Sequence, residues 1–270
     1  MGAGCAALAA SALCLGAMAA PALGAHPLEP DLVTLPMEQD DLVLDQNGRG
    51  KNRQSILRMT NQVGNQGVGP LEIRASGASA NCDGDGDPDN DRIASQRIYR
   101  DEGDDGFDRD TDTDFSDSEI GCLKYHPAHL HWHVLDFSKY TLYSEETGEP
   151  TDGTKVGFCL GDSNEPFGPA PSDRFYRFSG CGTSGTPPGP PVPPSFMGIS
   201  VGWADIYGSS TPGQRIRVTG LPRGRYCLRS EADPENNLSE LHDSNNAYDL
   251  RIHLNLADAK VKALTSACRL

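Results

Sequence analysis

The stretch His126-Pro-Ala-His129-Leu-His131-Trp-His133 holds four of the seven histidines of this chain. Apolar residues continue the pattern as far as Leu142, and the whole run is typical of a β-strand. Alternate side chains of a strand share a face, so His129, His131 and His133 are expected to point the same way. The residues between and after them are expected on the opposite, buried face: Leu130, Trp132 and Val134.

The spacing of these three histidines predicts a metal site, because imidazole is the commonest side-chain ligand of transition metals. On a straight strand His129 and His133 would stand about 13 Å apart. A shared ion therefore requires a bend or a bulge. Three nitrogen ligands with open positions suit copper or zinc. The alternative is a solvated histidine strip or an expression tag, which the flanking apolar residues and the mid-chain position disfavour.

The composition favours a β protein with long loops. The 270 residues are enough for one large domain or two small ones, and 30 glycines and 20 prolines favour irregular structure over helix. The formal net charge of -15 argues against nucleic acid as a partner. An acidic surface attracts cationic partners instead.

Residues 1–25 contain a small-residue, apolar stretch, Ala6 to Ala25, that resembles a signal peptide cleaved after Ala19 or Ala25. It lacks the basic start that such peptides usually have, and a retained anchor is the alternative. We expect a secreted or extracytoplasmic protein with no membrane span in the mature form. Residues 26–270 are then expected to form a single domain.

Six cysteines lie outside the leader, and an even, dispersed set in an exported chain predicts disulfides. Free buried thiols in a cytosolic enzyme are the alternative. The cysteines alone leave the connectivity open. They are Cys82, Cys122, Cys159, Cys181, Cys227 and Cys268.

The remaining pattern predicts an all-β fold, an antiparallel β-sandwich with long loops and little helix. No helical period appears before Leu256, and no internal repeat is present. Residues 187–194 read as a proline-rich surface spacer. Strands are expected at Ser55–Thr60, Pro70–Ala75, Gly198–Ile206, Arg215–Thr219, Arg225–Arg229 and Tyr248–Leu254, with short apolar segments at Lys155–Leu160 and Arg174–Phe178.

Residues 81–119 are expected to form an Asp-rich loop. Carboxylates alternate there with glycine, proline and asparagine, which favours calcium, a hard cation that prefers oxygen ligands. A solvated acidic loop is the alternative, because the full EF-hand spacing is missing. The alternating carboxylates are Asp83, Asp85, Asp87, Asp89 and Asp91.

Several segments resemble the lysyl oxidase family, in patches from Ser55 to Leu254. The stretch His126–His133 looks like the family's copper-binding segment, a histidine followed by His-x-His-x-His. Lys155-Val-Gly-Phe-Cys-Leu-Gly-Asp162 is similar to its Lys-x-x-Phe-Cys-Leu-x-Asp. Gly202-Trp-Ala-Asp-Ile-Tyr207 resembles the segment that carries a quinone-forming tyrosine.

Three shorter segments add to the resemblance. Pro222-Arg-Gly-Arg-Tyr226 is similar to a family Pro-Gly-Asn-Tyr with one residue inserted. Glu240–Asn246 looks like Glu-Ser-Asp-x-x-Asn-Asn, with the aspartate one position later. Asn65-Gln-Gly67 matches a short Asn-Gln-Gly.

The resemblance implies a copper amine oxidase whose cofactor, lysine tyrosylquinone, is made from its own lysine and tyrosine. His129, His131 and His133 would bind copper, with His126 near the site but not a first-choice ligand. Lys155 and Tyr207 would form the quinone.

Such an enzyme converts primary amines, peptidyl lysine or small amines, to aldehydes and releases H2O2 and ammonia. Cross-linking needs a neutral Lys155, so surroundings that lower its pKa are expected. The short chain and the leader suggest a microbial member. The acidic surface favours lysine-rich peptides or proteins, or small amines, as substrates.

The resemblance leaves the general base open among Asp136, Asp162 and Asp205. Two cysteines of the family pattern are replaced, by Ala128 and Glu165. Their usual partners correspond to Cys159 and Cys181, which are therefore predicted to pair with each other. Cys82–Cys122 and Cys227–Cys268 are the pairs left over.

Two other functions compete with the oxidase. One is an exported, non-enzymatic metal-binding β-sandwich that serves adhesion or cell-wall interaction. The other is a zinc hydrolase that uses the three histidines and a metal-bound water. Neither accounts for the Lys155 and Tyr207 segments.

Overall fold

The computed structural model describes residues 26–79, 81–87, 90–103, 106–127, 129–182 and 193–269. In this part of the chain the regular elements are β-strands and four short 3-10 helices, and all neighbouring strands pair antiparallel. The expected antiparallel all-β class is therefore confirmed. The predicted leader lies outside the described residues, as does most of the proline-rich spacer. None of the described helices is long and apolar enough to cross a membrane.

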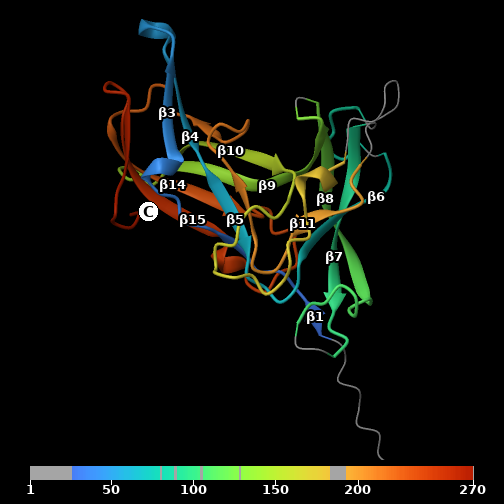
Figure 1. Cartoon of the computed structure of the whole chain (residues 1–270). Helices are drawn as coiled ribbons and strands as arrows, with labels where there is room; N and C mark the ends of the chain where they lie inside the picture. Colours follow the sequence, from blue (N-terminus) through green and yellow to red (C-terminus); the bar gives the residue numbers. More distant parts are fainter. Residues whose placement is uncertain are drawn as a thin grey trace, which may run out of the picture.

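A large sheet has two halves that run in different directions, β9, β10, β14 and β15 in one and β6, β7 and β8 in the other (Figure 1). Its central path runs β11-β6-β7-β8-β9-β14-β15-β16. β1 pairs with β7 and β10 with β9, away from that path. Its strands are β1 (Pro27–Leu28), β6 (Leu71–Ser79), β7 (Asp91–Arg100), β8 (Phe115–His126), β9 (His131–Ser144), β10 (Pro150–Phe158), β11 (Met197–Ile199), β14 (Gly224–Ala232), β15 (Ala247–Asn255) and β16 (Lys260–Ala263).

Two three-stranded sheets pack against the large one, in the orders β12-β5-β2 and β13-β4-β3. Contacts of β13 with β9 and β10, and of β2 with β14 and β15, join the layers. The strands are β2 (Leu32–Thr34), β3 (Leu42–Asn47), β4 (Gln54–Met59), β5 (Asn61–Asn65), β12 (Ala204–Tyr207) and β13 (Arg215–Arg217). The 3-10 helices are η1 (Gln39–Asp41), η2 (Gly50–Asn52), η4 (Phe178–Gly180) and η5 (Asp243–Asn245).

β9 connects the two halves of the large sheet. Its first residues pair with β8, from Leu123 opposite Val134 to His126 opposite His131, and its later residues pair with β14. Val134 also pairs with Phe158 of β10, so β8 and β14 follow each other along one edge of β9 while β10 takes the other. Asp136, at φ 54°, lies where the partner changes.

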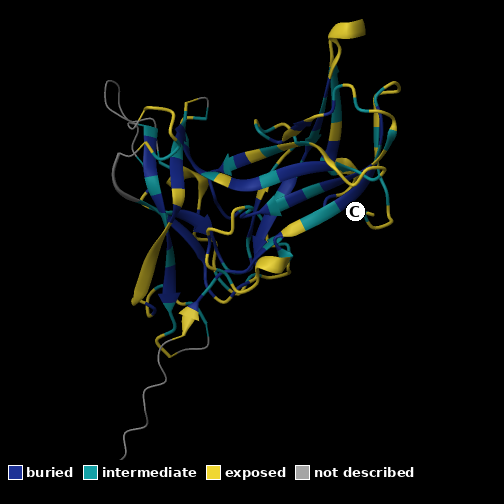
Figure 2. Ribbon diagram, turned by 180° about the vertical axis from the view of Figure 1, so that it is seen from behind, coloured by how far each residue is buried: buried dark blue, intermediate teal, exposed yellow. Residues whose placement is uncertain are grey.

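The core lies between the layers, where buried residues line the facing strands (Figure 2). The alternation of β4 shows the cause: Ser55, Leu57 and Met59 are buried while the residues between them are half-exposed. Trp132 and Tyr140 of β9 are fully buried and are among the largest core side chains. Each Å² of apolar surface that is removed from water stabilises the fold by about 25 cal/mol, so this interface is the main source of stability.

Three disulfides join the predicted cysteine pairs, Cys82–Cys122, Cys159–Cys181 and Cys227–Cys268. All three pairings expected from the sequence are confirmed. Disulfides of this kind persist in oxidising, extracytoplasmic surroundings.

Two of the shorter family-like segments act as structural anchors. The side chain of Asn65 accepts the backbone N–H of Asp31 and of Gly67, both at 3.0 Å, and donates to the carbonyls of Gly69 (3.0 Å) and Ile199 (3.1 Å). It thereby ties the N-terminal strand to the turn before β12. Satisfied buried amides of this kind fix one backbone path.

The segment Glu240–Asn246 holds the same N-terminal strand from the other side. The Glu240 carboxylate accepts the backbone N–H of Leu32 at 2.8 Å and the Asn246 amide at 2.6 Å. Asp31 accepts the Asn245 amide at 2.7 Å. Burial raises the pKa of Glu240 to about 7.

The structure differs from the expected elements in two places. The strand expected at 198–206 is two strands, β11 and β12, separated by a turn in which Trp203 N–H bonds to the Ser200 carbonyl at 3.1 Å. The Asp-rich region at 81–119 is not one loop, because it contains β7 and the start of β8.

We predict that Glu240→Gln flattens the pH dependence of stability between pH 4.5 and 7. The folded protein binds the Glu240 proton more tightly than the unfolded chain does, so its contribution is complete below pH 4.5 and is lost as pH rises through 7. Urea unfolding of wild type and variant across this range measures the difference. The matched control is Glu119→Gln at an exposed position, which should leave the wild-type slope unchanged. Parallel profiles for wild type and Glu240→Gln would contradict the prediction.

Candidate metal centre

A tight turn before β9 brings the histidines together. The backbone N–H groups of His129 and Leu130 both donate to the carbonyl of His126, at 3.0 and 2.9 Å. Leu130 adopts φ 60°, and β9 begins only at His131. The bend that the sequence required for a shared ion is therefore present. Ala128, inside this turn, lies outside the described residues.

His129, His131 and His133 converge, with one ring nitrogen from each lying within 4.8 Å of the others. Nδ1 of His129 and Nε2 of His133 are 3.2 Å apart. Zinc– or copper–imidazole bonds of about 2 Å fit a set of nitrogens this closely grouped. The donors thus fit the three-nitrogen copper or zinc site expected from the sequence.

The three imidazoles are held in the neutral form that binds metal. Burial, followed by the nearby histidines, lowers the pKa of His131 and of His133, the latter to about 3. Burial also lowers the pKa of His129. Because a metal displaces no proton from a neutral imidazole, the site needs no deprotonation at neutral pH.

His126 lies against this group rather than in it. Its ring stacks on that of His129 at a centroid distance of 4.0 Å, and its Nδ1 is buried without a hydrogen-bond partner. One expectation about this region is wrong: Leu130 does not face the core but is 60% exposed, because it belongs to the turn and not to the strand. Trp132 and Val134 are buried as expected.

Tyr207 lies in the same pocket as two of the histidines. A pocket of about 440 Å³ is lined by His129, His131, Tyr207 and Cys159 among others. The Tyr207 hydroxyl donates to the Cys159 carbonyl at 2.5 Å, and its ring stacks on Phe158 at 4.0 Å. Burial raises the pKa of Tyr207 well above its ordinary value, so the phenol is neutral.

A disulfide joins the tyrosine side of this pocket to the histidine strand. Cys159, at the end of β10, is bonded to Cys181. The carbonyl of Cys181 accepts the backbone N–H of Trp132 at 2.8 Å, between His131 and His133. The departure from the family's cysteine pattern therefore leaves a link between the two halves of the pocket.

Lys155 is not brought to Tyr207. It alternates along β10 with Val156 and Phe158, whose side chains are buried, and so faces the other side of the sheet. Its ammonium lies 2.7 Å from Glu235 and 3.3 Å from Asp136, and the bond to Glu235 chiefly raises its pKa. The expectation of a lowered pKa at Lys155 is wrong for this conformation.

The three carboxylates considered as general bases have different surroundings. Asp162 accepts the backbone N–H groups of Phe175 and Tyr176, each at 2.9 Å, and therefore fixes a loop. Asp136 pairs with Lys155. Asp205 shares β12 with Tyr207 and is buried, with Oδ2 lacking a partner, and burial raises its pKa well above the usual range. Of the three, Asp205 is the one beside Tyr207.

The Asp-rich segment is closed by a lysine. Asp83, Asp85 and Asp91 each bring one oxygen within 4.8 Å of the others, but the ammonium of Lys124 on β8 binds both Asp83 and Asp85. Calcium binding there stays a prediction that requires Lys124 to be displaced. Asp89 lies outside the described residues.

Comparison with known proteins identifies the family. A family model described as lysyl oxidase matches residues 112–264, more than half of the chain. The chain belongs to the lysyl oxidase family. Human lysyl oxidase homolog 1 is 32% identical over 132 residues, which cover 48% of this chain and 20% of that protein. Human protein-lysine 6-oxidase is 30% identical over 125 residues, which cover 46% of this chain and 26% of that protein. The chain thus spans about a quarter or less of the length of these two relatives.

Membership in the lysyl oxidase family makes copper the metal to test at the three histidines. Sequence reasoning did not find the other residues of the pocket, namely Phe178, Ile206, Thr211 and Pro212. Ile206 belongs to the Gly202–Tyr207 segment, and Thr211 and Pro212 follow it closely, so proximity in sequence was the available signal. Phe178 carried none, since only the fold places it there.

We predict that His131→Ala lowers the affinity for Cu²⁺ by about 100-fold or more, since one of three nitrogen donors is lost. His126→Ala should cost only about tenfold, the lower end of the range found for side chains that support ligands. Competition against a chelator of known affinity, with bound metal counted by mass spectrometry, measures both. His253→Ala, on β15, is the control. Equal losses for His126→Ala and His131→Ala would contradict the assignment of ligands.

Proposed function

We propose that this protein is a secreted, copper-dependent amine oxidase and that residues 26–270 form its single catalytic domain. The observation that carries the proposal is that three neutral histidines converge, and two of them line one pocket together with the half-buried Tyr207. Membership in the lysyl oxidase family supports the same activity. The overall reaction would take a primary amine, O2 and water to an aldehyde, ammonia and H2O2.

In this proposal His129, His131 and His133 hold copper, and Tyr207 and Lys155 supply lysine tyrosylquinone. When bound, copper supplies redox chemistry at the tyrosine, and the quinone supplies an electrophile for the amine. The chain itself keeps the imidazoles neutral and covers one face of the Tyr207 ring with Phe158.

The present arrangement of Lys155 does not fit the completed quinone. Its ammonium is protonated and paired with Asp136 and Glu235 on the side of β10 away from Tyr207. The cross-link therefore requires Lys155 to leave these carboxylates. Asp205, buried beside Tyr207, is the carboxyl best placed to hold or accept a proton there.

The mouth of the pocket indicates which amines it accepts. Phe178 and Ile206 line it and are 40% and 42% exposed, and Leu130 in the histidine turn is 60% exposed. Large apolar side chains at an opening favour a substrate that covers them. We therefore propose that the amine is carried on an apolar or aromatic arm, or on a lysine with apolar neighbours.

We predict a covalent Lys155–Tyr207 link in protein loaded with copper in air. Mass spectrometry of proteolytic fragments should find the linked peptides, together with quinone absorbance and a phenylhydrazine adduct. Lys155→Arg and Tyr207→Phe should abolish all three signals and amine oxidation. The control Tyr143→Phe, a tyrosine of β9 outside the pocket, should keep them. Wild-type rates of H2O2 release in Tyr207→Phe would sink the proposed function.

We predict that Ile206→Ser raises KM for benzylamine about fivefold, while KM for the diamine cadaverine changes less than twofold. Loss of apolar contact worth about 1 kcal/mol accounts for the larger figure. H2O2-coupled kinetics measure both constants. Val43→Ser removes an equally exposed aliphatic side chain on β3, 40% exposed, and should change neither. The same KM change for both amines would show that the mouth does not contact the apolar arm.

A further inference from the structure

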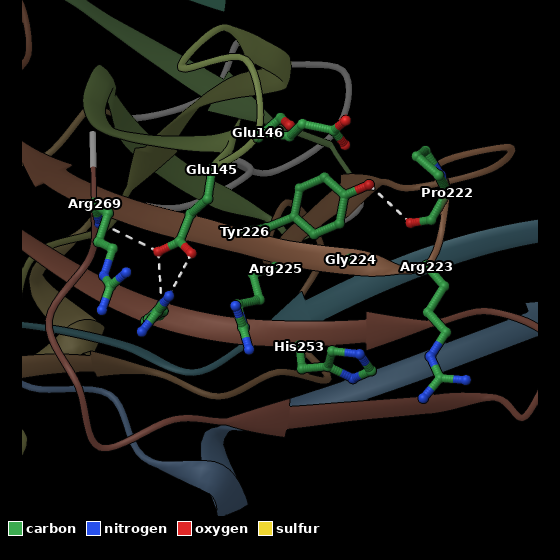
Figure 3. Close-up of a pocket in the computed structure, with 11 residues that line it drawn as sticks. Glu145, Glu146, Pro222, Arg223, Gly224, Arg225, Tyr226, His253 and Arg269 are labelled. Carbon is green, nitrogen blue, oxygen red and sulfur yellow. Dashed lines mark hydrogen bonds and ion pairs between the residues drawn. The ribbon is translucent and has the colours of Figure 1, made fainter.

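A groove of about 510 Å³ opens at the other end of β9 from the histidines (Figure 3). β9 begins at His131, and the groove is lined by Ser144 at its end, roughly 40 Å of strand away. The groove shares no residue with the pocket of Tyr207. Any ligand that it holds therefore binds apart from the proposed oxidase site.

Positive side chains dominate this groove although the chain as a whole carries a net charge of -15. Four arginines and a histidine line it against two glutamates: Arg223, Arg225, Arg251, Arg269 and His253 against Glu145 and Glu146. Arg223, Arg225 and Arg269 are exposed. Within the described residues none of these three forms an ion pair, so their guanidinium groups are available to a ligand.

The register of the sheet extends the positive surface. Arg225 of β14 pairs with His253 of β15, which pairs with Lys262 of β16. Side chains of directly paired residues point to the same face, and adjacent strands are about 4.8 Å apart. Lys262 is exposed. A row of basic groups therefore runs from the groove across three strands.

A buried ion pair makes the base of the groove a fixed structure. Nε of Arg251 lies 2.7 Å from Glu145, and its Nη2 donates to the other carboxylate oxygen at 2.7 Å. Both side chains are more than nine-tenths buried. Arg251 also donates to the hydroxyl of Ser266 at 2.6 Å, and the disulfide Cys227–Cys268 fixes the same tail. Glu145 is thereby neutralised and Arg269 is held at the rim.

We propose that this groove is a binding site for phosphate or sulfate groups, with Arg225 and Arg269 at one end of it and Arg223 at the other (Figure 3). A guanidinium presents a planar fork of donors that matches oxyanions in pairs of hydrogen bonds. The two forks of Arg225 and Arg269 already offer more donors than the two oxygens of a carboxylate accept, and a tetrahedral oxyanion has more oxygens to meet them. The group comes either as a free ion or as a repeated unit of an anionic polymer.

The test is isothermal titration calorimetry, in which inorganic phosphate is added to the full chain at fixed ionic strength and pH. We expect saturable binding that weakens at least about tenfold in R223Q/R225Q, since charge-assisted hydrogen bonds are lost. The matched control R49Q/R53Q removes the same charge from exposed positions around η2, on the β3–β4 hairpin, and should change the affinity less than twofold. R269Q gives a second, independent loss. Circular dichroism verifies that each variant is folded.

Further titrants separate the sources of the group. If polyphosphate binds more tightly per phosphate group than inorganic phosphate, the natural ligand is a polymer. If the two bind equally, the natural ligand is the free ion. Both outcomes support the site. Citrate bound more tightly than phosphate would overturn the preference for a tetrahedral oxyanion. Absence of binding by phosphate, sulfate and polyphosphate, or equal losses in R49Q/R53Q, would overturn the site itself. The readout is independent of amine oxidation.

Discussion

The disulfide Cys159–Cys181 and the hydrogen bond that Cys181 accepts from Trp132 hold the proposed active site together. His131 and His133 lie on β9, His129 lies in the turn before it, and the tyrosine lies on β12, which belongs to a different sheet. Cys159 meets both, since its carbonyl accepts the Tyr207 hydroxyl and its sulfur is tied to the residue that binds the histidine strand. The family-like pocket therefore depends on a covalent link between segments distant in sequence. Ala128 and Glu165 replace two cysteines of the family pattern, but Cys159 and Cys181 still form a disulfide, with each other.

Electrostatics separates the molecule into regions with different tasks. Around the metal centre burial keeps His133 and Tyr207 uncharged, so the pocket offers neutral donors in an acidic protein. At the far end of β9, the buried Arg251 and Glu145 of the groove cancel each other's charge. The exposed arginines of the groove therefore give it a net positive charge. Buried charges are stable only when paired, whereas exposed ones act on ligands. The two ends of β9 therefore present opposite kinds of site on one strand.

The sequence predicted the cluster of three histidines and the disulfide pairs but not every element that positions them. Histidine spacing predicted both a candidate ligand set and the need for a bend, because strand geometry limits what one ion can reach. It could not place Leu130, since the turn is set by hydrogen bonds to His126 that no pattern encodes. β7 was missed because the acidic composition around it suggested a loop, although its burial alternates as a strand requires. Lys155 and Phe158 point to opposite faces of β10, and it is Phe158 that contacts Tyr207. Which face of β10 meets Tyr207 is decided by tertiary packing, which the local sequence does not specify.

Lys155 is close to Tyr207 along the chain path, although its side chain points to the opposite face of the sheet. Cys159 lies at the Tyr207 hydroxyl, and Lys155 is four residues before it, a span of at most about 14 Å of chain. Within the described strands β10 is bonded to β9 alone, so local release breaks one ladder. The two ion pairs of Lys155 are solvent-exposed and therefore weak, while each ladder hydrogen bond contributes about 1 kcal/mol. The barrier to bringing Lys155 to Tyr207 therefore lies mainly in the β9–β10 backbone pairing upstream of the disulfide, and less in the carboxylates that hold the lysine.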